Sequence, residues 1–306
     1  MADTQTIDQR SLAEQSNEVT HVVGVMSGKG GVGKSLVTGL LACALRKAEH
    51  EVGILDADVT GPSIPKMFGI TERPEMSELG MFPVKTRSGI RVISINLFLE
   101  NPDDAVIWRG PMLSNTVRQF WQDVFWGKLD YLLVDLPPGT ADVPLTVMQT
   151  LPLDCVVVVT SPQDLAAMVV RKAVDMCGKM NVPVLGLVQN MAWLKCPNCD
   201  DVIYPFGRAN GDALAHEMGV PHLLDLPIDP DISARADSGT IEGYESNLFV
   251  DKIEAISNAI ESASYAKGTG VRCSSACTPS NSASTTSGLR RERRQAETAV
   301  DKTNKG

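Results

Sequence analysis

An eight-residue stretch limits what this chain can fold into more than any other feature of its sequence. Residues 28–35 read GKGGVGKS and fit the pattern G-x-x-x-x-G-K-S/T, directly after the apolar run HVVGVMS at 21–27 and directly before a helical run. Glycines in this stretch allow a tight turn whose N–H groups point into one concavity, and the following helix adds its positive end. The sequence therefore predicts a strand, a phosphate-binding loop and a helix in succession.

The residues of this loop have distinct expected roles in binding a nucleotide. Lys34 would reach the β- and γ-phosphates, and the Ser35 hydroxyl would ligate Mg²⁺, as phosphoryl transfer requires. The expected ATP-binding set comprises Gly28, Lys29, Gly30, Gly31, Val32, Gly33, Lys34 and Ser35. The alternative is a chance glycine-rich turn, which the flanking strand and helix disfavour.

A second lysine, Lys29, stands early in the loop, and this is the signature of the deviant Walker A ATPases. In that group the lysine typically reaches the nucleotide of the facing subunit, so we expect Lys29 to act in catalysis across a dimer. The alternative is a solvated surface lysine. Because its position in the motif is specific, the catalytic interpretation is favoured.

The order of apolar and helical runs predicts an α/β fold. Near-continuous apolar strands that alternate with helices are typical of a mostly parallel central sheet with helices on both faces. Ligands in such sheets gather at the carboxyl ends of the strands. The expected strands lie at 21–27, 51–58, 90–98, 130–138, 155–162, 182–191 and 222–229, and the expected helices at 34–48, 112–126, 165–180 and 210–218.

Three aspartates close two of these strands and form the candidate magnesium and water site. Asp56 and Asp58 follow the strand in ILDADVTGP, and Asp135 ends YLLVDLPPG in the manner of a Walker B residue. We assign Asp56 and Asp135 to the Mg²⁺ shell and Asp58 to positioning the attacking water. Strand-end aspartates also serve as turn or N-cap residues, which remains the alternative for all three.

Asn190 ends the strand run VLGLVQNM and is the candidate for reading the base. Its carboxamide offers both a donor and an acceptor, the pairing chemistry used for adenine elsewhere. As a single amide it could instead be a turn residue with its hydrogen bonds satisfied locally. We therefore expect an adenine contact at this strand end.

A cysteine pair supplies a second chemistry. Cys196 and Cys199 have C-x-x-C spacing in WLKCPNCDD, and two thiolates on a tight turn suit an iron–sulfur cluster or Zn²⁺. Two sulfurs are too few for a four-thiolate site, so a symmetry mate is the simplest donor of the other two. The alternatives are an intrachain zinc site completed by Cys273 and Cys277, a redox disulfide, or cysteines without a ligand.

Composition and charge limit which binding partners and which cellular compartment are expected. The formal net charge is −9, and the last 44 residues carry an excess of lysine and arginine, so the body is more acidic still and a nucleic-acid partner is not expected. No apolar run approaches the roughly 20 residues of a membrane span. The odd cysteine count and the polar start indicate a cytoplasmic protein, with Cys43, Cys155 and Cys177 as core residues.

The chain is expected to hold one domain with two flexible ends. Residues 1–19 are polar without apolar periodicity, so they are predicted to be a flexible leader. The domain would span 20–262. Residues 263–306 are rich in Ser, Thr and charge, which predicts a disordered tail.

With these residues in view, the chain resembles the Mrp/ApbC family of P-loop iron–sulfur carrier ATPases. The resemblance covers about residues 20 to 262 and rests on VMSGKGGVGKS, DADVTGPSIPKMFG, WRGPM, WGKLDYLLVDLPPGTAD, TSPQDLA, QNMAWLKCPNC and LPIDPDI, in this order. It implies a homodimer with slow ATP hydrolysis coupled to cluster loading or transfer. It also implies a 4Fe–4S cluster bridged by the Cys196 and Cys199 pairs, with cluster donors and apo iron–sulfur clients as partners. Thr60 and Ala141 depart from the family pattern.

A positioning or partitioning ATPase of the deviant Walker A type, with a structural zinc or redox cysteine pair, is the alternative from another functional class. It would use the same loop and dimer switch to bind DNA or a membrane. The acidic body argues against DNA, and RRERR in the tail lacks the bulky apolar face of a membrane-surface helix. The cysteine pair favours the carrier.

Overall fold

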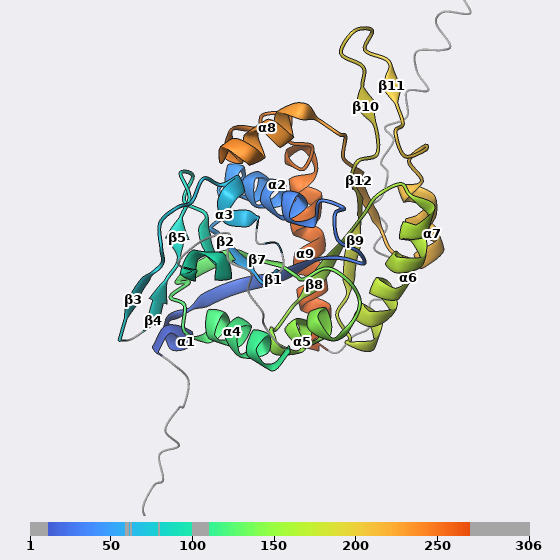
Figure 1. Ribbon diagram of the computed structural model, residues 1–306. Coiled ribbons are helices and arrows are strands. Elements are labelled where there is room, and N and C mark those ends of the chain that lie inside the picture. The colour runs from blue at the N-terminus through green and yellow to red at the C-terminus, as the bar shows by residue number, and fades with distance from the viewer. Residues whose placement is uncertain (1–11, 59–60, 62, 79, 100–109, 270–306) are drawn as a thin grey trace, which may run out of the picture. The chain divides into compact units, whose positions relative to one another are not determined.

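The computed structural model describes residues 12–58, 61, 63–78, 80–99 and 110–269 of the 306-residue chain. In this part of the chain the main sheet has eight strands in the order β12-β9-β8-β1-β7-β2-β6-β5 (Figure 1). Every neighbouring pair is parallel except β5 with β6. The strands are β1 (Glu18–Ser27), β2 (Val52–Asp56), β5 (Val84–Lys85), β6 (Arg91–Ser94), β7 (Lys128–Asp135), β8 (Cys155–Thr160), β9 (Val184–Gln189) and β12 (His222–Asp225).

Helices cover both faces of the sheet, which confirms the predicted fold class. Strand alternation sends Val23 and Val25 of β1 into the core under α2, α3, α8 and α9, and Val22 and Met26 into the core under α4 to α7. The helices are α1 (Leu12–Ser16), α2 (Lys34–Lys47), α3 (Ile64–Met67), α4 (Gly110–Gln122), α5 (Asp142–Thr150), α6 (Asp164–Lys179), α7 (Gly211–Met218), α8 (Pro230–Ser238) and α9 (Ile253–Thr269). Across the described ranges, none of them has the length and apolar character to cross a membrane.

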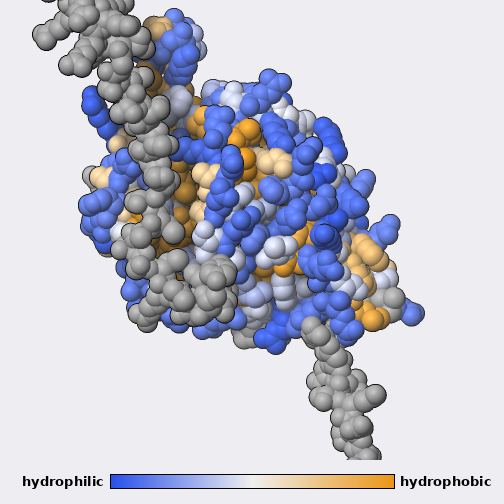
Figure 2. Space-filling view, turned by 180° about the vertical axis from the view of Figure 1, so that it is seen from behind, coloured by the Kyte–Doolittle hydropathy of each residue, from blue (hydrophilic) through white to orange (hydrophobic). Residues whose placement is uncertain are grey.

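Among the described residues, two small hairpins lie outside the main sheet. β3 (Glu75–Ser77) pairs with β4 (Gly80–Phe82), and β10 (Leu194–Lys195) pairs with β11 (Val202–Ile203). The β10–β11 hairpin projects from the body in Figure 1. Cys196 and Cys199 lie between β10 and β11, so the cysteine pair is on this projecting hairpin, the cysteine arm. The rear surface in Figure 2 is largely hydrophilic, with an apolar area at its lower right.

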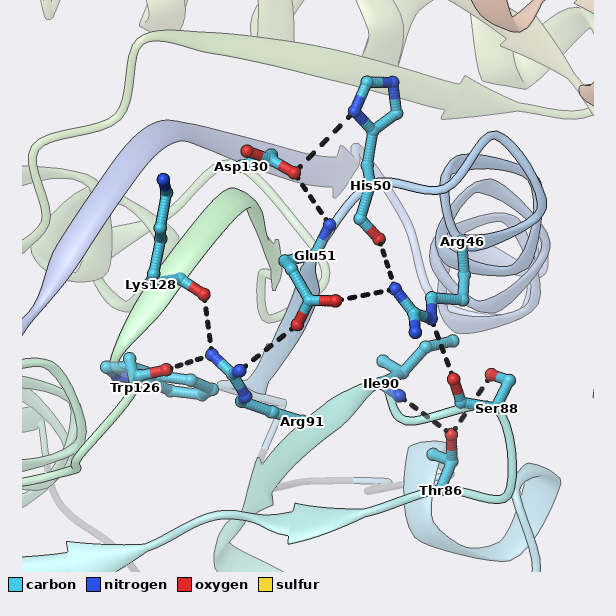
Figure 3. A network of polar contacts seen from close by, with 10 residues as sticks. All are labelled: Arg46, His50, Glu51, Thr86, Ser88, Ile90, Arg91, Trp126, Lys128 and Asp130. Atoms are coloured by element: carbon cyan, nitrogen blue, oxygen red, sulfur yellow. Dashed lines mark hydrogen bonds and ion pairs between the residues drawn. The ribbon is translucent and has the colours of Figure 1, made fainter.

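A polar network fastens the amino ends of the central strands, at the edge opposite the phosphate loop (Figure 3). The Glu51 carboxylate bridges two guanidinium groups, with 2.8 Å to Arg46 Nη1 and 3.2 Å to Arg91 Nη2. The Glu51 backbone N–H donates to Asp130 Oδ2 at 2.8 Å, and Arg91 Nη1 donates to the Lys128 carbonyl at 2.7 Å. These bonds link α2, β2, β6 and β7 and hold the amino ends of the strands in place relative to one another.

The ends of the domain differ from those expected. The predicted leader is wrong from residue 12 onward, because α1 buries Ala13 completely and β1 begins at Glu18. Asn17 Nδ2 donates to the Val124 carbonyl at 2.8 Å, and Asn17 Oδ1 accepts from Gly127 N at 2.9 Å. One small apolar residue and one side-chain amide anchor this segment, and neither produces a periodic pattern.

The predicted tail boundary also shifts. Helix α9 continues past residue 262 to Thr269, and its own residues Ile256 and Ile260 are buried. Residues 1–11 and 270–306, together with Thr60, lie outside the described residues. Cys273 and Cys277, which would complete the alternative intrachain zinc site, lie there as well. In the expected strand 90–98, β6 ends at Ser94 and a 3-10 turn follows at Ile95–Phe98.

Candidate functional site

The phosphate loop connects β1 to α2 as the motif predicts. Gly33 precedes α2 with φ 82°, and Gly31 has φ 80°, a left-handed conformation that glycine adopts without strain. A side chain at Gly28 would meet α6, because a Cβ atom there would lie 2.2 Å from Val169 Cγ1. The loop therefore needs glycine for its turns and for its close approach to α6, and the amino end of α2 opens onto it.

Four side chains meet directly beneath the loop. Lys34 Nζ lies 2.7 Å from Asp135 Oδ1 and 3.3 Å from Asp58 Oδ2, and Lys34 is only 5% exposed. Ser35 Oγ donates to Asp135 Oδ2 at 2.5 Å. The structure thus brings together the lysine, the serine and two of the aspartates that the sequence singled out.

The third aspartate joins them through strand register. Asp56 on β2 is the register partner of Asp135 on β7, and it is 1% exposed. Its carboxylate accepts hydrogen bonds from Ser94 Oγ at 2.9 Å and from the Asp58 backbone N–H at 3.1 Å. Parallel pairing of β2 with β7 therefore sets two carboxylates side by side at the carboxyl edge of the sheet.

Burying these charged groups together is energetically unfavourable, and this shifts their pKa values. Burial, reinforced by the Asp135 charge, raises the pKa of Asp56 well above its ordinary value. Burial also raises the pKa of Asp135, against the opposing charge of Lys34. Burial alone would lower the pKa of Lys34, but Asp135 and Asp58 outweigh it and the pKa is raised. Carboxylate and hydroxyl oxygens are the ligands that Mg²⁺ prefers, so Ser35, Asp56 and Asp135 fit a divalent cation that would offset the excess negative charge.

Lys29 lies apart from this buried group. Its amino group donates to Gln163 Oε1 at 2.5 Å, on the segment that leads into α6, and it is partly exposed. This position at the rim of the loop is compatible with reaching a facing subunit. The catalytic role of Lys29 stays a prediction.

Asn190 is next to the loop but is engaged differently from the expectation. It is 2% exposed, and its Nδ2 donates to the Val32 carbonyl at 2.9 Å. One N–H of the carboxamide thus supports the loop backbone, and the carboxamide also has a second N–H and the Oδ1 acceptor. The adenine contact stays a prediction.

The cysteine pair lies in the turn between β10 and β11. The Cys196 carbonyl accepts from Asp200 N at 3.1 Å, and Cys196 N donates to the Asp201 carbonyl at 2.8 Å. The backbone N–H groups of Asn198 and Cys199 lower the pKa of the Cys196 thiol, because they donate to its sulfur. A thiolate held in this way is suited to bind a soft metal or an iron–sulfur cluster.

The described part of the chain adds no further ligands to this pair. It holds no group of three or more His, Cys, Asp or Glu side chains that could bind a metal ion. Cys199 is exposed and Cys196 half-buried, whereas Cys43, Cys155 and Cys177 are buried as expected. Exposed apolar side chains follow the pair on the same arm: Val202, Ile203, Tyr204 and Phe206.

Sequence reasoning missed several residues that complete the site. Thr38 Oγ1 donates to Asp135 Oδ1 at 3.0 Å, and Ser94 holds Asp56 as described above. Thr38 could have been found from its helical spacing of four from Lys34. Ser94 and Gln163 gave no signal, because their importance arises from contacts between strands and loops distant in sequence.

Comparison with known proteins identifies the family of this chain. The model of a family described as NUBPL iron-transfer P-loop NTPase, of the ParA group, matches residues 18–261. An iron-sulfur cluster carrier protein of Clostridium perfringens is 46% identical over 241 residues, covering 76% of this chain and 84% of the relative. A cytosolic Fe-S cluster assembly factor, the Nubp2 homolog of Anopheles gambiae, is 44% identical, covering 73% of this chain and 88% of the relative.

Solved structures give the same picture. A nucleotide-binding protein from Archaeoglobus fulgidus, in complex with ADP and with Co, superposes with a TM-score of 0.68 at 44% identity, covering 76% of this chain and 91% of that chain. The cell division ATPase MinD of Pyrococcus furiosus has a TM-score of 0.56 at 22% identity, covering 79% and 98%, and shares the fold. By the matched family model and by these relatives, the chain belongs to the NUBPL-type iron-transfer P-loop NTPase family.

Proposed function

We propose that this chain is an ATP-binding and ATP-hydrolysing carrier that holds a 4Fe–4S cluster at a homodimer interface and transfers it to apoproteins. The observation that carries the proposal is the turn of Cys196 and Cys199, whose backbone amides stabilise a thiolate on an arm of a P-loop fold. The names of the Clostridium perfringens and Anopheles gambiae relatives support the same cargo.

The nucleotide half of the proposal assigns a role to each side chain under the loop. Lys34 binds the β- and γ-phosphates, and Ser35, Asp56 and Asp135 hold Mg²⁺, which would neutralise charge that develops during phosphoryl transfer. Asp58 orients the attacking water. Lys29 acts on the nucleotide of the facing subunit. Buried donors act strongly here because they lie in a low dielectric and need no reorganisation during the reaction.

The cluster half follows from the number of thiolates. A thiolate-held 4Fe–4S cluster takes four sulfurs and each chain offers two on this turn, so two chains related by a two-fold axis would complete the site. The exposed side chains of Val202, Ile203, Tyr204 and Phe206 support this, since a symmetry mate at the turn would cover apolar surface. Cluster donors and apo iron–sulfur proteins are the expected partners, in the cytoplasm, with slow hydrolysis coupled to loading or transfer.

A positioning ATPase remains the competing function. Its support is the likeness to MinD, which at 22% identity concerns the fold alone. In that function Cys196 and Cys199 would be a structural zinc or redox pair, so cluster binding distinguishes the two functions.

Anaerobic reconstitution tests the carrier directly. We expect one 4Fe–4S cluster per dimer by iron and sulfide content and by absorption. The variants Cys196→Ser and Cys199→Ser should lose the cluster and retain ATP binding, because the two sites lie on different elements. Cys177→Ser, which changes a buried core cysteine, is the matched control and should keep it.

A mixed dimer gives the decisive result. One subunit lacks both Cys196 and Cys199 and its partner is unchanged, so bridging predicts loss of the stable cluster. Full retention of the cluster, or one zinc per monomer that depends on Cys273 and Cys277, contradicts the bridged carrier and favours an intrachain metal site.

A further inference from the structure

Two buried amides occupy adjacent positions where β9 ends. Gln189 is 0% exposed and Asn190 is 2% exposed. Successive residues of a strand point to opposite sides, so the two carboxamides face different neighbours. Buried polar side chains need hydrogen-bond partners, and each of these finds its partner in a different functional loop.

Asn190 is hydrogen-bonded to the phosphate loop and packs closely against it. Its Nδ2 donates to the Val32 carbonyl at 2.9 Å. The same nitrogen packs against Gly33, where an added Cβ atom would lie only 2.2 Å away. Gly33 directly precedes Lys34, so a displacement of the loop when phosphate binds would move the end of β9.

Gln189 is fastened to the other end of the cysteine arm. Its Nε2 donates to Asn210 Oδ1 at 2.8 Å, and its Oε1 accepts from Asn210 N and from Gly211 N at 3.0 Å each. Asn210 is the last residue before α7 and ends the segment 192–210, which carries Cys196 and Cys199. One carboxamide therefore holds the point where the arm returns to the body.

The same strand end also holds the point where the arm leaves the body. The Gln189 carbonyl accepts from Leu226 N at 2.8 Å, and Ala192 N donates to the Leu226 carbonyl at 2.9 Å. Between them Met191 has φ 59°, a left-handed conformation that is uncommon for a residue with a long side chain. Strain of this kind persists only where the surroundings enforce it, here the bonds on either side of Met191.

From this arrangement we infer that Gln189 is a positioning residue which couples occupancy of the phosphate loop to the geometry of the cysteine pair. A shift of Val32 and Gly33 passes through Asn190 to the end of β9, and Gln189 passes it to both ends of the arm. The inference rests on the proposed function, because it assumes that both sites act in one protein. Coupling of this kind is reciprocal, so a metal on the cysteines changes nucleotide affinity by the same factor.

Thiol reactivity measures the coupling without a cluster. Alkylation rates of Cys196 and Cys199 are followed by peptide-resolved mass spectrometry on the full chain, with and without saturating Mg-ADP. We expect the nucleotide to change these rates by about fivefold or more, the range of ordinary allosteric coupling. In Gln189→Met, which removes the three side-chain bonds at similar volume, the change should fall below about twofold while ADP affinity is retained.

Two further variants guard against a failure to fold. Gln189→Glu keeps the acceptor for Asn210 N and Gly211 N and should restore much of the nucleotide effect. Asn210→Ala, at an exposed position, removes one of the three side-chain bonds and should lower the effect partly. A graded loss across these variants distinguishes positioning from general damage.

The matched control is a buried amide elsewhere. Asn247 is 4% exposed, donates to the Leu40 carbonyl at 2.8 Å and accepts from Phe249 N at 3.0 Å. Asn247→Leu should leave the nucleotide effect intact. Equal alkylation rates with and without Mg-ADP in the unaltered protein overturn the inference. So does an effect that survives in Gln189→Met, or one that Asn247→Leu abolishes equally. A chain that shows the coupling but binds no cluster would refute the proposed function instead.

Discussion

The phosphate loop and the cysteine arm are opposite kinds of site in one chain. Under the loop, Lys34 and Asp135 are 5% and 0% exposed and are bonded to each other, so the loop site is preorganised before any ligand arrives. On the arm, Cys199 is exposed, and the neighbouring Ile203 and Phe206 are 46% and 40% exposed. The difference is that one chain buries and pairs the charges under the loop, whereas the arm exposes a thiol beside apolar side chains.

The two sites also differ in what they cost the folded protein. Burying the Asp56 and Asp135 carboxyls side by side opposes folding, and such strain is typical of functional sites. The arm costs little, because its side chains remain largely in water. Variants at the loop should therefore change stability and catalysis together, while variants on the arm should change ligand binding alone.

The largest expected effect breaks the loop site. Lys34→Ala removes the charge that meets the β- and γ-phosphates, and turnover should fall by about 100-fold or more, the scale for losing one preorganised charge stabiliser. The measurement is steady-state ATP hydrolysis with circular dichroism as a check on the fold. Lys47→Ala is the control, since Lys47 lies at the other end of α2 and donates to the Tyr244 carbonyl at 3.2 Å. Unchanged turnover in Lys34→Ala would end the assignment of the loop.

The sequence predicts the main sheet and the phosphate loop better than it predicts the cysteine arm. Each of the seven expected strands entered the main sheet, because long apolar runs have few other ways to be buried. The two-residue strands β5, β10 and β11 gave no such pattern and were missed. At the loop the motif identified Lys34 and Ser35, but the convergence of Asp56 with Asp135 depends on which strands are neighbours.

Residues at strand ends show a second limit of sequence reasoning. The chemistry of Asn190 predicts an adenine contact, which stays a prediction, but its residue type does not predict that Nδ2 also donates to the Val32 carbonyl. The adjacent Gln189 carries no signal in the sequence, although it fastens the cysteine arm. Which loop each of these adjacent amides contacts depends on strand alternation and on the exact end of β9, and neither follows from residue types. Helix α8 is a different case, because its start signal is visible in the sequence and was missed. Asp229 caps the helix by accepting from Asp231 N at 2.9 Å, and Pro230 follows as the first helical residue.

A smaller effect tests the cost of the loop site. Asp56→Asn removes a buried negative charge beside Asp135, and an amide can still accept from Asp58 N and donate to Ser94 Oγ. In Mg²⁺-free buffer the free energy of unfolding should rise by about 1 kcal/mol, and the midpoint of thermal unfolding by a few degrees. The stabilisation that Mg-ATP adds should shrink, because a ligand for Mg²⁺ is lost.

Calorimetry with and without Mg-ATP measures both parts of that prediction. Asp130→Asn, at the opposite edge of the sheet, is the control for removing a partly buried carboxylate. A lower unfolding temperature for Asp56→Asn in Mg²⁺-free buffer would show that this carboxylate is stabilising, and the contrast in cost between the two sites would fail.

The smallest effect concerns the ion pairs near the foot of the arm. His222 Nδ1 lies 3.0 Å from Asp212 Oδ1 on α7, and Nε2 lies 3.0 Å from Asp225 Oδ1. The hydrogen bond to Asp225 raises the pKa of His222, with Asp225 and Asp212 adding to it by charge, against the effect of burial. A raised pKa in the folded state means that protonation stabilises the fold. That contribution is fully present below the unfolded value of about 6.5 and is lost as pH rises through the folded value.

His222→Gln should therefore lower the free energy of unfolding near pH 5.5 by about 1 kcal/mol or less, a modest figure because Asp212 is exposed and water screens its charge. Near pH 9 the same substitution should cost measurably less, since the histidine is then neutral in both states. Urea unfolding at the two pH values gives the difference, and His216→Gln, at an exposed position of α7, is the control substitution. If His222→Gln destabilised the protein more at pH 9 than at pH 5.5, the result would contradict this expectation. Protonated His222 would then not stabilise the packing of α7 on β12.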